Sequence, residues 1–474
     1  MRFLLAGEWV DRVERLEVTD PYDLTVVDDV GVATSADVDA AVAAARQALE
    51  QPLSTRSRMD VLVRAADILD ERHSEAATLI AREGIKTIRE AEVEASRAVE
   101  TLRLSSEEAR RVDGETIRFD QYPTGAGRIG FTVREPVGVV AAITPFNDPL
   151  NLVANKVGPA LAAGNTVIVK PDSKTPLSAL LLGEILTEAG VPGGHLQVLP
   201  GPGRVLAGAL AAHSDVAMVS FTGGVATGEA IAASAGLKRQ VMELGANCPV
   251  IVHADADVDT AVDRIASGAF LAAGQNCLHV QRVYVHEEVA DVFISDFVKA
   301  AEQVELGPKL DRATDMGPII DVASMERIEA AVDEAVAAGA AVLTGGRRHG
   351  TSYLPTVLVD APSSSPVVTD EIYGPVTVVE TYSDLTDAIR RCNNTDFGLQ
   401  GAVFTRDIGT AFGVAHALRC GGVMVNDSTD FRIDAMPFGG VGLSGVGREG
   451  VRSAVEEMTE PKVVCFADAV PVGS

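Results

Sequence analysis

The feature that most constrains this fold is a regular alternation of short apolar runs with longer helical segments from residue 137 onward. Strands that alternate with helices predict a parallel sheet with both faces covered. The first series has strand candidates at 137–144, 166–170, 196–199 and 216–221, and helix candidates at 150–163 and 176–189, with Gly190 as a helix stop. A second series starts near Pro249, with strand candidates at 250–252, 282–285, 376–381 and 402–404 and a helix at 326–338. The pattern therefore predicts an α/β fold with two open α/β domains.

The remaining segments fit around these two series. Residues 36–110 read as helices, because Ala-rich stretches carry charges at helical spacing. Residues 128–136 are strand-like and interrupted by Pro. The chain has 474 residues, so two or three structural units are expected. The boundary between the two series falls near residue 245.

Composition narrows the classes of function. The formal net charge of −27 disfavours nucleic acid and anionic membranes as partners, because both reward clusters of Lys and Arg. The five Cys form no Cys-x-x-Cys pair, which argues against a disulfide framework and favours a reducing compartment, by default the cytoplasm. The eight His show no metal-ligand spacing, so no metal site is expected. No signal peptide or membrane-spanning run is predicted.

Cys277 is the candidate nucleophile. It closes the run Gly274-Gln275-Asn276-Cys277, and Glu243 lies upstream of it in a second Gly-containing run. A thiol, a carboxylate and a flexible Gly-rich frame are the parts that covalent catalysis through a thioester needs. A single intracellular Cys is by itself more often an inert buried side chain. The neighbouring motifs favour the catalytic interpretation.

Four strand ends carry candidate ligand-binding runs, since ligands of open α/β sheets gather at strand ends. Asn147 offers an amide donor for an oxyanion, or is a turn residue. Lys170 ends a strand just before a helix, where a ribose or phosphate could bind, or is an exposed lysine. The run 221–228 opens a helix after a strand, but neither it nor 201–203 is a strict Gly-x-Gly-x-x-Gly. The run 370–375 places a carboxylate beside a tight turn, or is only a turn.

Taken together, these runs resemble the aldehyde dehydrogenase superfamily, and within it the lactaldehyde and semialdehyde dehydrogenases. They occur in family order and spacing from about residue 20 onward, as Thr144-Pro145-Phe146-Asn147, Lys170-Pro171, Phe221-Thr222-Gly223-Gly224, Glu243-Leu244-Gly245, Gly274-Gln275-Asn276-Cys277, Glu371 to Pro375 and Met436-Pro437-Phe438-Gly439-Gly440. The resemblance implies a Rossmann-like NAD(P)-binding domain, a catalytic domain and a small β oligomerisation arm, at 1–120 with 138–245, 246–445, and 121–137 with 446–474. It also implies a homo-oligomer, either a dimer or a tetramer.

The resemblance implies a mechanism for the site residues. Cys277 attacks the aldehyde as a thiolate, and Asn147 with the Cys277 backbone N–H holds the oxyanion. Hydride transfer to the nicotinamide leaves a thioester, and Glu243 serves as general base for the water that hydrolyses it. Lys156 and Glu449 match positions that form a proton path to Glu243, although Lys156 could equally be a surface helix residue.

Cofactor roles are implied in the same way. Lys170 is expected on the adenine ribose, and Glu371 on the nicotinamide ribose with Tyr373 close by. The expected cofactor residues are Ile143, Thr144, Pro145, Phe146, Lys170, Ser173, Gly203, Phe221, Thr222, Gly223, Gly224, Thr227, Leu244, Glu371 and Tyr373. NAD-restricted members often carry Glu where this chain has Ser173, and Ser would not repel a 2′-phosphate. NADP is therefore expected to be accepted, with NAD still able to bind.

The resemblance points to a small polar aldehyde, such as a hydroxyaldehyde or a semialdehyde, oxidised to its acid. Arg432 could pair with a carboxylate or phosphonate tail, or form a structural salt bridge with a nearby Asp. Asp148 stands where phosphonate-oxidising relatives carry His, which weakens the phosphonate option. His279 and Arg97 are further candidates to line the substrate tunnel.

Three alternative functions use the same residues differently. A CoA-acylating semialdehyde dehydrogenase would exclude water and usually lacks the Glu base, so Glu243 argues for hydrolysis. A cysteine hydrolase would pair Cys277 with a His and would need no cofactor-type strand ends. A non-catalytic structural relative is opposed by the joint presence of Asn147, Glu243 and Cys277.

Overall fold

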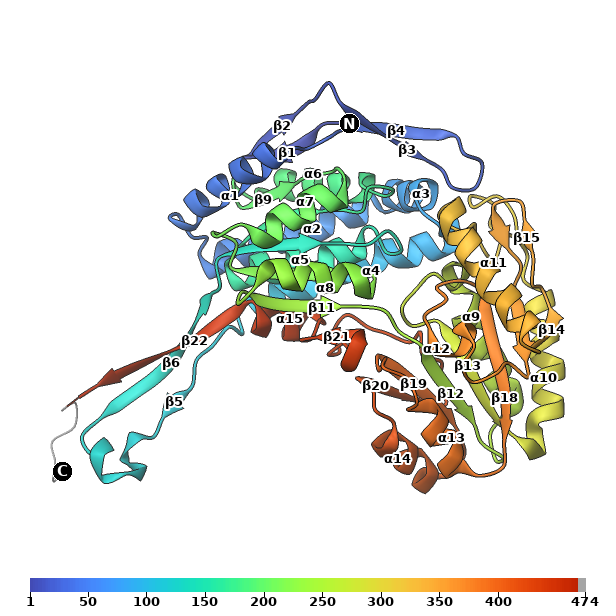
Figure 1. The fold of residues 1–474 in the computed structure, drawn as a ribbon. Coiled ribbons are helices and arrows are strands. Elements are labelled where there is room, and N and C mark those ends of the chain that lie inside the picture. The colour runs from blue at the N-terminus through green and yellow to red at the C-terminus, as the bar shows by residue number, and fades with distance from the viewer. Residues whose placement is uncertain (468–474) are drawn as a thin grey trace.

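The first sheet has eight strands in the order β2-β1-β9-β8-β7-β10-β11-β21, near the centre of Figure 1. The computed structural model describes residues 1–467. The strands are β1 Phe3–Leu5, β2 Glu8–Val10, β7 Val139–Ile143, β8 Thr166–Lys170, β9 Leu196–Val198, β10 Met218–Thr222, β11 Arg239–Glu243 and β21 Gly445–Val446.

The middle of this sheet is parallel and doubly wound. β9, β8, β7, β10 and β11 run parallel, and the winding changes direction between β7 and β10. β7 and β8 are buried along their whole length, as parallel strands covered on both faces require. In such sheets ligands bind outside the carboxyl ends of the strands at this change of direction. The ends of β7 and β10 are therefore where a site is expected.

Helices cover both faces of the first sheet (Figure 1). They are α1 Ser35–Leu49, α2 Thr55–Glu71, α3 His73–Glu83, α4 Ile88–Ala109, α5 Asn151–Ala163, α6 Leu177–Ala189, α7 Gly203–Ala212, α8 Val225–Ala235 and α15 Val451–Glu457. α4 and α15 enclose α5, so all 13 residues of α5 are buried. Thr34 and Thr87 begin α1 and α4 with capping boxes, and Gly190 ends α6 in the left-handed region, as expected.

The second sheet has seven strands in the order β14-β17-β18-β13-β12-β19-β20. They are β12 Cys248–Val252, β13 Val280–His286, β14 Ala341–Thr344, β17 Thr356–Val359, β18 Val376–Tyr382, β19 Gln400–Phe404 and β20 Gly422–Val425, and only β14 pairs antiparallel. The helices around it are α9 Val258–Phe270, α10 Glu287–Glu302, α11 Val322–Ala337, α12 Pro366–Thr369, α13 Leu385–Cys392 and α14 Ile408–Ala417. Residues 244–247 lead from β11 into β12 and so connect the two sheets. The expected α/β fold with two open sheets is confirmed.

An arm built from two distant parts of the chain projects from the first sheet at the lower left of Figure 1. Its sheet contains β22 Thr459–Phe466, β6 Ile129–Pro136 and β5 Thr116–Ile117. β22 pairs with β6 without interruption from Thr459 opposite Pro136 to Phe466 opposite Ile129. Because the two strands are 323 residues apart at their nearest register pair, only the folded chain can bring them together.

The boundaries expected for the arm differ from the structure at both ends. β5 belongs to the arm sheet although it lies before residue 121, since its residues pair with β6. At the other end, β21 pairs with β11 and α15 packs on α5, so residues 446–457 belong to the first sheet's domain. Residues 468–474 of the expected arm lie outside the described part of the chain.

The first 31 residues form strands that the sequence analysis did not predict. β1 joins the first sheet by pairing antiparallel with β9. β3 Arg15–Thr19 and β4 Val26–Gly31 form a separate hairpin. These runs are short and mixed in polarity, so they carry no clear strand periodicity.

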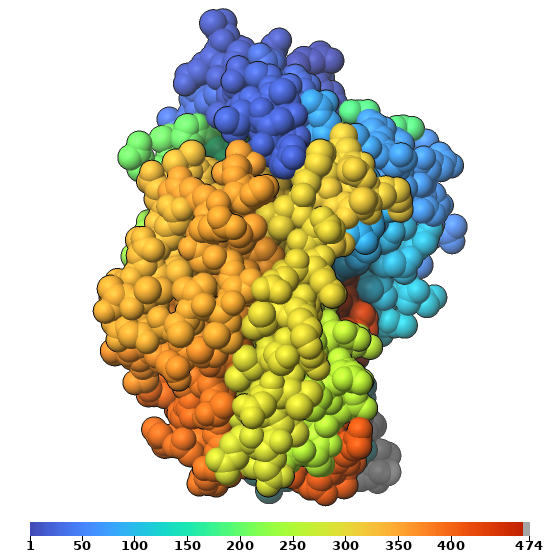
Figure 2. Space-filling view, turned by 90° about the vertical axis from the view of Figure 1, so that its right-hand side faces the viewer, coloured from blue at the N-terminus to red at the C-terminus, as the bar shows by residue number. Residues whose placement is uncertain are grey.

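Loops tie the two α/β domains together beside the hairpin. In Figure 2 the yellow segment of the second domain lies against light-blue atoms of the first domain. The Lys309 Nζ donates to the Gly84 carbonyl at 2.6 Å and pairs with Asp20 at 2.7 Å. The Thr351 hydroxyl donates to the Tyr22 carbonyl at 2.9 Å. Within residues 1–467, no helix is long and apolar enough to cross a membrane.

Candidate active site

A cavity of about 1540 Å³ lies between the two α/β domains. One wall comes from the carboxyl ends of β7, β8 and β10, where Thr144, Lys170 and Thr222 line it. The opposite wall comes from loops that enter the second sheet at its amino ends, including Cys277 before β13 and Tyr373 before β18. The first sheet therefore faces the cavity with the carboxyl ends of its strands, and the second sheet faces it with the amino ends.

The loop that carries Cys277 begins with a strained turn. After α9, residues Leu271–Gly274 form a tight 3₁₀ turn in which Ala272, Ala273 and Gly274 have φ of 50°, 53° and 66°. A Cβ on Gly274 would sit 2.3 Å from the Gly374 carbonyl oxygen, so only glycine fits there. Gln275 is fully buried, and its amide bonds to the Pro318 carbonyl at 3.0 Å and the Ile320 N–H at 2.9 Å. The loop is thus held from both sides of the turn.

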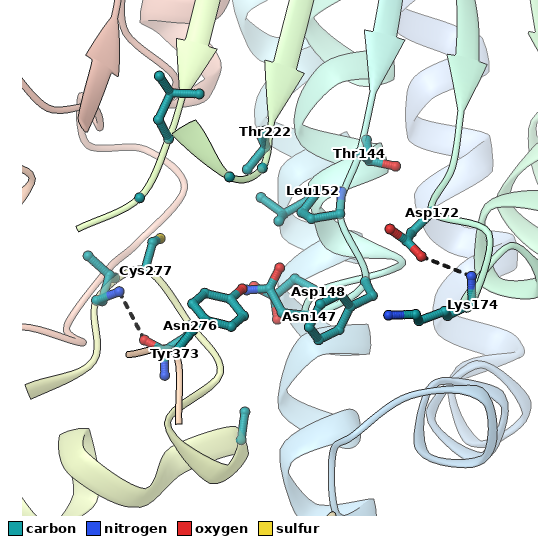
Figure 3. Close-up of a pocket in the computed structure, with 18 of the residues that line it drawn as sticks. Thr144, Asn147, Asp148, Leu152, Asp172, Lys174, Thr222, Asn276, Cys277 and Tyr373 are labelled. Atoms are coloured by element: carbon teal, nitrogen blue, oxygen red, sulfur yellow. Dashed lines mark hydrogen bonds between the residues drawn. The ribbon is translucent and has the colours of Figure 1, made fainter. Parts of the chain in front are cut away.

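Cys277 lies in a small apolar cluster and faces Asn147 across the cavity. Its packing partners include Cys248, Leu278 and Phe438. Burial raises the pKa of the Cys277 thiol, and the positive charge of Arg432 opposes that rise. Figure 3 shows Cys277 on one wall and Asn147 on the other.

Asn147 follows β7 on a loop that enters α5. Its side chain is buried at the cavity wall, and its Oδ1 has no hydrogen-bond partner within the described residues. Asn147 therefore lines the cavity from a bend in this loop.

Glu243 ends β11 but does not line the cavity, unlike Leu244 beside it. Its carboxylate is 2% exposed, and neither oxygen has a hydrogen-bond partner within the described residues. Burial and the negative charge of Glu449 raise its pKa well above the ordinary value, while Arg432 and Lys156 oppose this. The carboxylate lies close to Gly439. A Cβ added to Gly439 would sit 2.7 Å from Oε1 of Glu243.

Lys156 is a fully buried residue of α5, so the alternative of a surface position is wrong. Its Nζ forms an ion pair with Glu449 and donates to the Ser220 hydroxyl at 3.1 Å. Burial pushes the pKa of Glu449 up, but Lys156 and Arg432 outweigh it and leave that pKa below its usual range. Glu449 lines the cavity, and it lies beside Lys156 and Glu243, neither of which lines it.

All of the expected cofactor residues line the cavity. The Lys170 side chain is buried and makes no hydrogen bond or ion pair within the described residues, and burial lowers its pKa. The Thr144 hydroxyl is likewise buried without a partner. Ser173 donates to the Gly201 carbonyl at 3.0 Å, and Lys174 forms an ion pair with Asp321 of the other domain. Buried donors without partners fit a ligand rich in hydroxyl and phosphate oxygens.

Glu371 lies on the opposite wall. It accepts the Ala246 N–H at 2.8 Å, and a Cβ on Gly245 would sit 2.5 Å from its Oε2. Burial raises the pKa of Glu371 to about 7. The run 370–375 was expected at the end of a strand, but it precedes β18 and enters the sheet instead. It reaches the cavity because the second sheet faces it with amino ends.

The three expected substrate residues have different positions. Arg432 and Arg97 line the cavity, but His279 does not. The His279 side chain is buried, and its Nε2 bonds to the Val376 carbonyl at 2.9 Å. The expectation for His279 is therefore wrong, because its neighbouring strands, β13 and β18, enclose the ring.

Arg432 combines burial with free donors. Its guanidinium carbon lies 3.8 Å from the Phe438 ring centroid. Its Nη2 lies 3.5 Å from Glu449 and 3.9 Å from Asp434, beyond hydrogen-bond contact, and neither Nε nor Nη2 has a partner within the described residues. Arg97 is bound more firmly, with 3.2 and 3.1 Å bonds to Asp434. The expected salt bridge of Arg432 with a nearby Asp is therefore present, although only Arg97 adds hydrogen bonds to Asp434.

Some residues at the cavity were missed by the sequence analysis. Ile231 and Ser234 follow Thr227 on the same face of α8, so helical spacing could have identified them. Arg327 lines the cavity, and Asp434 does not line it but binds Arg97 at the wall. Neither carried a usable signal, because Arg327 reaches the Ile372 carbonyl and Asp434 reaches Arg97 through tertiary contacts alone. Within residues 1–467, no cluster of His, Cys, Asp or Glu could hold a metal ion.

Residues 9–464 match the aldehyde dehydrogenase family, and the chain belongs to that family. It is an NAD(P)-dependent aldehyde dehydrogenase, as its membership and the paired walls of the cavity indicate.

Similar proteins include the 3-sulfolactaldehyde dehydrogenase of Priestia megaterium, which is 43% identical over 97% of this chain and 96% of its own. The crystal structure of aldehyde dehydrogenase 21 from Physcomitrella patens, in complex with the reaction product succinate, has a TM-score of 0.97 and 38% identity over 99% of both chains. A glyceraldehyde-3-phosphate dehydrogenase from Methanocaldococcus jannaschii, complexed with NADP, has a TM-score of 0.92 and 37% identity over 97% of this chain and 100% of its own.

Proposed function

We propose that this enzyme oxidises a small aldehyde with an anionic tail to the carboxylic acid. The observation that carries this proposal is Arg432, a buried guanidinium at the cavity wall with two N–H donors that have no acceptor within the described residues. Glu449 and Asp434 balance the charge of Arg432, but its two unbonded N–H donors remain costly unless a ligand supplies an acceptor. The descriptions of the three similar proteins mention 3-sulfolactaldehyde, succinate and glyceraldehyde-3-phosphate. Each of these compounds carries an anionic group, which supports an anionic ligand.

Cys277 is the proposed nucleophile. The cavity brings its thiol to the wall opposite Asn147, whose side-chain amide is the proposed oxyanion donor together with the Cys277 backbone N–H. The thiol must lose its proton against a raised pKa, and Arg432 is the nearby cation that favours the thiolate. The positive charge of Arg432 therefore has two proposed partners, the anionic tail of the substrate and the Cys277 thiolate. It must stabilise both when the substrate is bound.

The cofactor groove supports NADP or NAD. Lys170, Thr144 and Ser173 are the residues that would hold the ribose and phosphate end, and Glu371 the nicotinamide ribose. When bound, the nicotinamide supplies the acceptor for the aldehyde hydride. Ser173 presents no carboxylate to a 2′-phosphate, so we propose that NADP is accepted as well as NAD.

Glu243 is the proposed base for hydrolysis of the thioester on Cys277. Its carboxylate is buried behind the cavity wall beside Glu449, so it must turn toward Cys277 before it can activate water. Lys156 and Glu449 are the proposed proton path: the Glu449 carboxylate accepts the proton when Glu243 returns to the buried position, and the Lys156 ammonium beside it releases a proton in turn. Retention of a carboxylate that can do this favours hydrolysis over transfer to CoA.

The anionic-tail proposal is tested by charge-matched substrates. Succinic semialdehyde and butanal have the same chain length and differ in the carboxylate. R432Q should lower kcat/KM for both aldehydes, because the Cys277 thiolate loses its nearby cation, but the loss should be about 10²-fold larger for the semialdehyde, since its bond to Arg432 is charge-assisted. R406Q is the matched control, because exposed Arg406 pairs with Asp257 outside the cavity. An equal loss on both aldehydes would show that Arg432 does not bind the anionic tail.

We also propose a homo-oligomer in a reducing compartment such as the cytoplasm. The arm exposes the apolar side chains Ile129, Phe131, Val463 and Phe466 on its paired strands, a surface that a second copy could cover. All five cysteines are free thiols, the state that a reducing compartment maintains. Sedimentation of the wild type and of V463D tests the first statement.

A further inference from the structure

The turn before Cys277 is held in a conformation that its own residues do not favour. Ala272 and Ala273 both lie in the left-handed region, with φ of 50° and 53°. For residues other than glycine this region costs energy, and such residues persist only where surrounding contacts hold them. Ala272 is buried with Ile85, Phe146 and Ile320, so packing from both domains meets at this turn. Packing alone leaves open what holds the Ala272 backbone.

The backbone bond at this turn comes from the other domain. The Ala272 N–H donates to Oε1 of Glu90 at 2.7 Å. Glu90 lies in the first turn of α4, and its second oxygen, Oε2, accepts the Thr87 N–H at 2.7 Å and the Thr87 hydroxyl at 3.1 Å. One partly buried carboxylate at the cavity wall thus caps a helix of the first domain and binds the strained turn of the second. Both oxygens are engaged, so the side chain has no freedom to move from this position.

The proposed mechanism assigns no role to Glu90, and a simple cap would not need the second bond. The capping box of α1 shows the difference. There Asp37 accepts the Thr34 N–H at 2.8 Å and the Thr34 hydroxyl at 2.9 Å, and its other oxygen pairs with Arg12 of its own domain. Only Glu90 directs its remaining oxygen to the loop of the nucleophile. The loop's other anchor, Gln275, bonds within the second domain.

We propose that Glu90 is a positioning residue, which holds the left-handed turn at Ala272 so that Cys277 faces the substrate. The nucleophile then takes its position from the first domain, the domain that carries the cofactor groove. Its alignment with Asn147 follows from a direct bond rather than from the second sheet alone. This inference rests on the proposed role of Cys277 as nucleophile.

The test measures the first turnover with full-length enzyme, saturating NADP and succinic semialdehyde. E90A should lower the rate of the first turnover at least tenfold, while the Kd for NADP changes less than threefold. D37A is the matched control, since it removes the same kind of cap and should leave the first-turnover rate within threefold of the wild type. Thermal unfolding of both variants shows whether their losses of stability are comparable.

A rescue experiment separates positioning from capping. Glycine adopts positive φ at little cost, so A272G needs less support from Glu90. The double variant E90A/A272G should recover at least threefold of the rate lost in E90A, while A272G alone stays within threefold of the wild type. A helix cap would not be restored by a change 182 residues away. If E90A does not accumulate as folded protein, E90Q and E90Q/A272G carry the same comparison, because one amide oxygen cannot serve both donors.

Two results would overturn the inference: a first-turnover rate in E90A equal to that of D37A, or no recovery in the double variant. Neither would affect the proposed function as long as C277A remains inactive. Activity retained in C277A would instead remove the nucleophile itself and the basis for this inference with it.

Discussion

The two sheets share one strand order but face the cavity with opposite ends of their strands. The first sheet contains the strand order β9-β8-β7-β10-β11, and the second contains the equivalent order β18-β13-β12-β19-β20. The first sheet turns the carboxyl ends of its strands to the cavity, and the second turns its amino ends. The same architecture therefore carries the proposed cofactor groove in one domain and the proposed nucleophile in the other.

This difference shows where the rule that ligands bind at the ends of strands applies. It locates Thr144, Lys170 and Thr222, because ligands of a doubly wound sheet bind at carboxyl ends. It fails for Cys277 and Tyr373, which sit on loops entering their strands. In the second domain the site residues depend on loop contacts rather than on the sheet edge. The predictions below probe this division between a binding wall and a reacting wall.

The largest expected effect separates the two walls. C277A should lower steady-state oxidation by about 10⁴-fold or more, since no other thiol lines the cavity within the described residues. Binding of NADP, measured by calorimetry, should stay within threefold, because the groove belongs to the other sheet. C465A, in the exposed arm strand β22, is the control. Comparable turnover in C277A and C465A would remove Cys277 from the mechanism.

A smaller effect is expected behind the reacting wall. E243Q should slow hydrolysis of the thioester by about 10³-fold, so that a burst of reduced cofactor precedes slow turnover. The base must be ionised, and burial raises the pKa of Glu243, so wild-type turnover should rise with pH through that raised pKa. The rising limb should be absent in E243Q. Stopped-flow absorbance over a pH series measures both, and a normal steady-state rate in E243Q would contradict the assignment.

The smallest effect is expected on the binding wall. S173E should lower kcat/KM for NADP about tenfold, because a carboxylate there repels a 2′-phosphate in a partly screened groove. The value for NAD should change little. S173A is the matched control, since it removes the hydroxyl that bonds Gly201 without adding charge. Parallel assays with both cofactors decide it, and equal losses with NAD and NADP would mean that Ser173 does not face the 2′ position.

Much of the fold could be predicted from local patterns. The strands β7 and β12 are continuous apolar runs, β8 has an apolar centre, and Gly190 marks the end of α6 as helix-stop rules require. The α/β class followed from their alternation. The N-terminal strands could not be predicted, because β1 is three residues long and exists through its pairing with β9.

The site was only partly accessible to the same reasoning. Residues within contiguous motifs, such as Asn147 and Cys277, could be found because each motif keeps its spacing along the chain. Glu90 and Asp434 act through bonds to residues 182 and 337 positions away, so no local pattern reports them. His279 misled for the opposite reason: it stands close to Cys277 in sequence, yet its ring points into the sheet.

The arm and the first domain also constrain the order of assembly. Strand β21 and helix α15 complete the first domain, and β22 completes the arm, although all three come from the last 30 described residues. During synthesis the first domain and the arm sheet therefore stay unfinished until the segment 445–466 has left the ribosome. Chains that stop before this segment cannot form the arm surface that is proposed to join subunits.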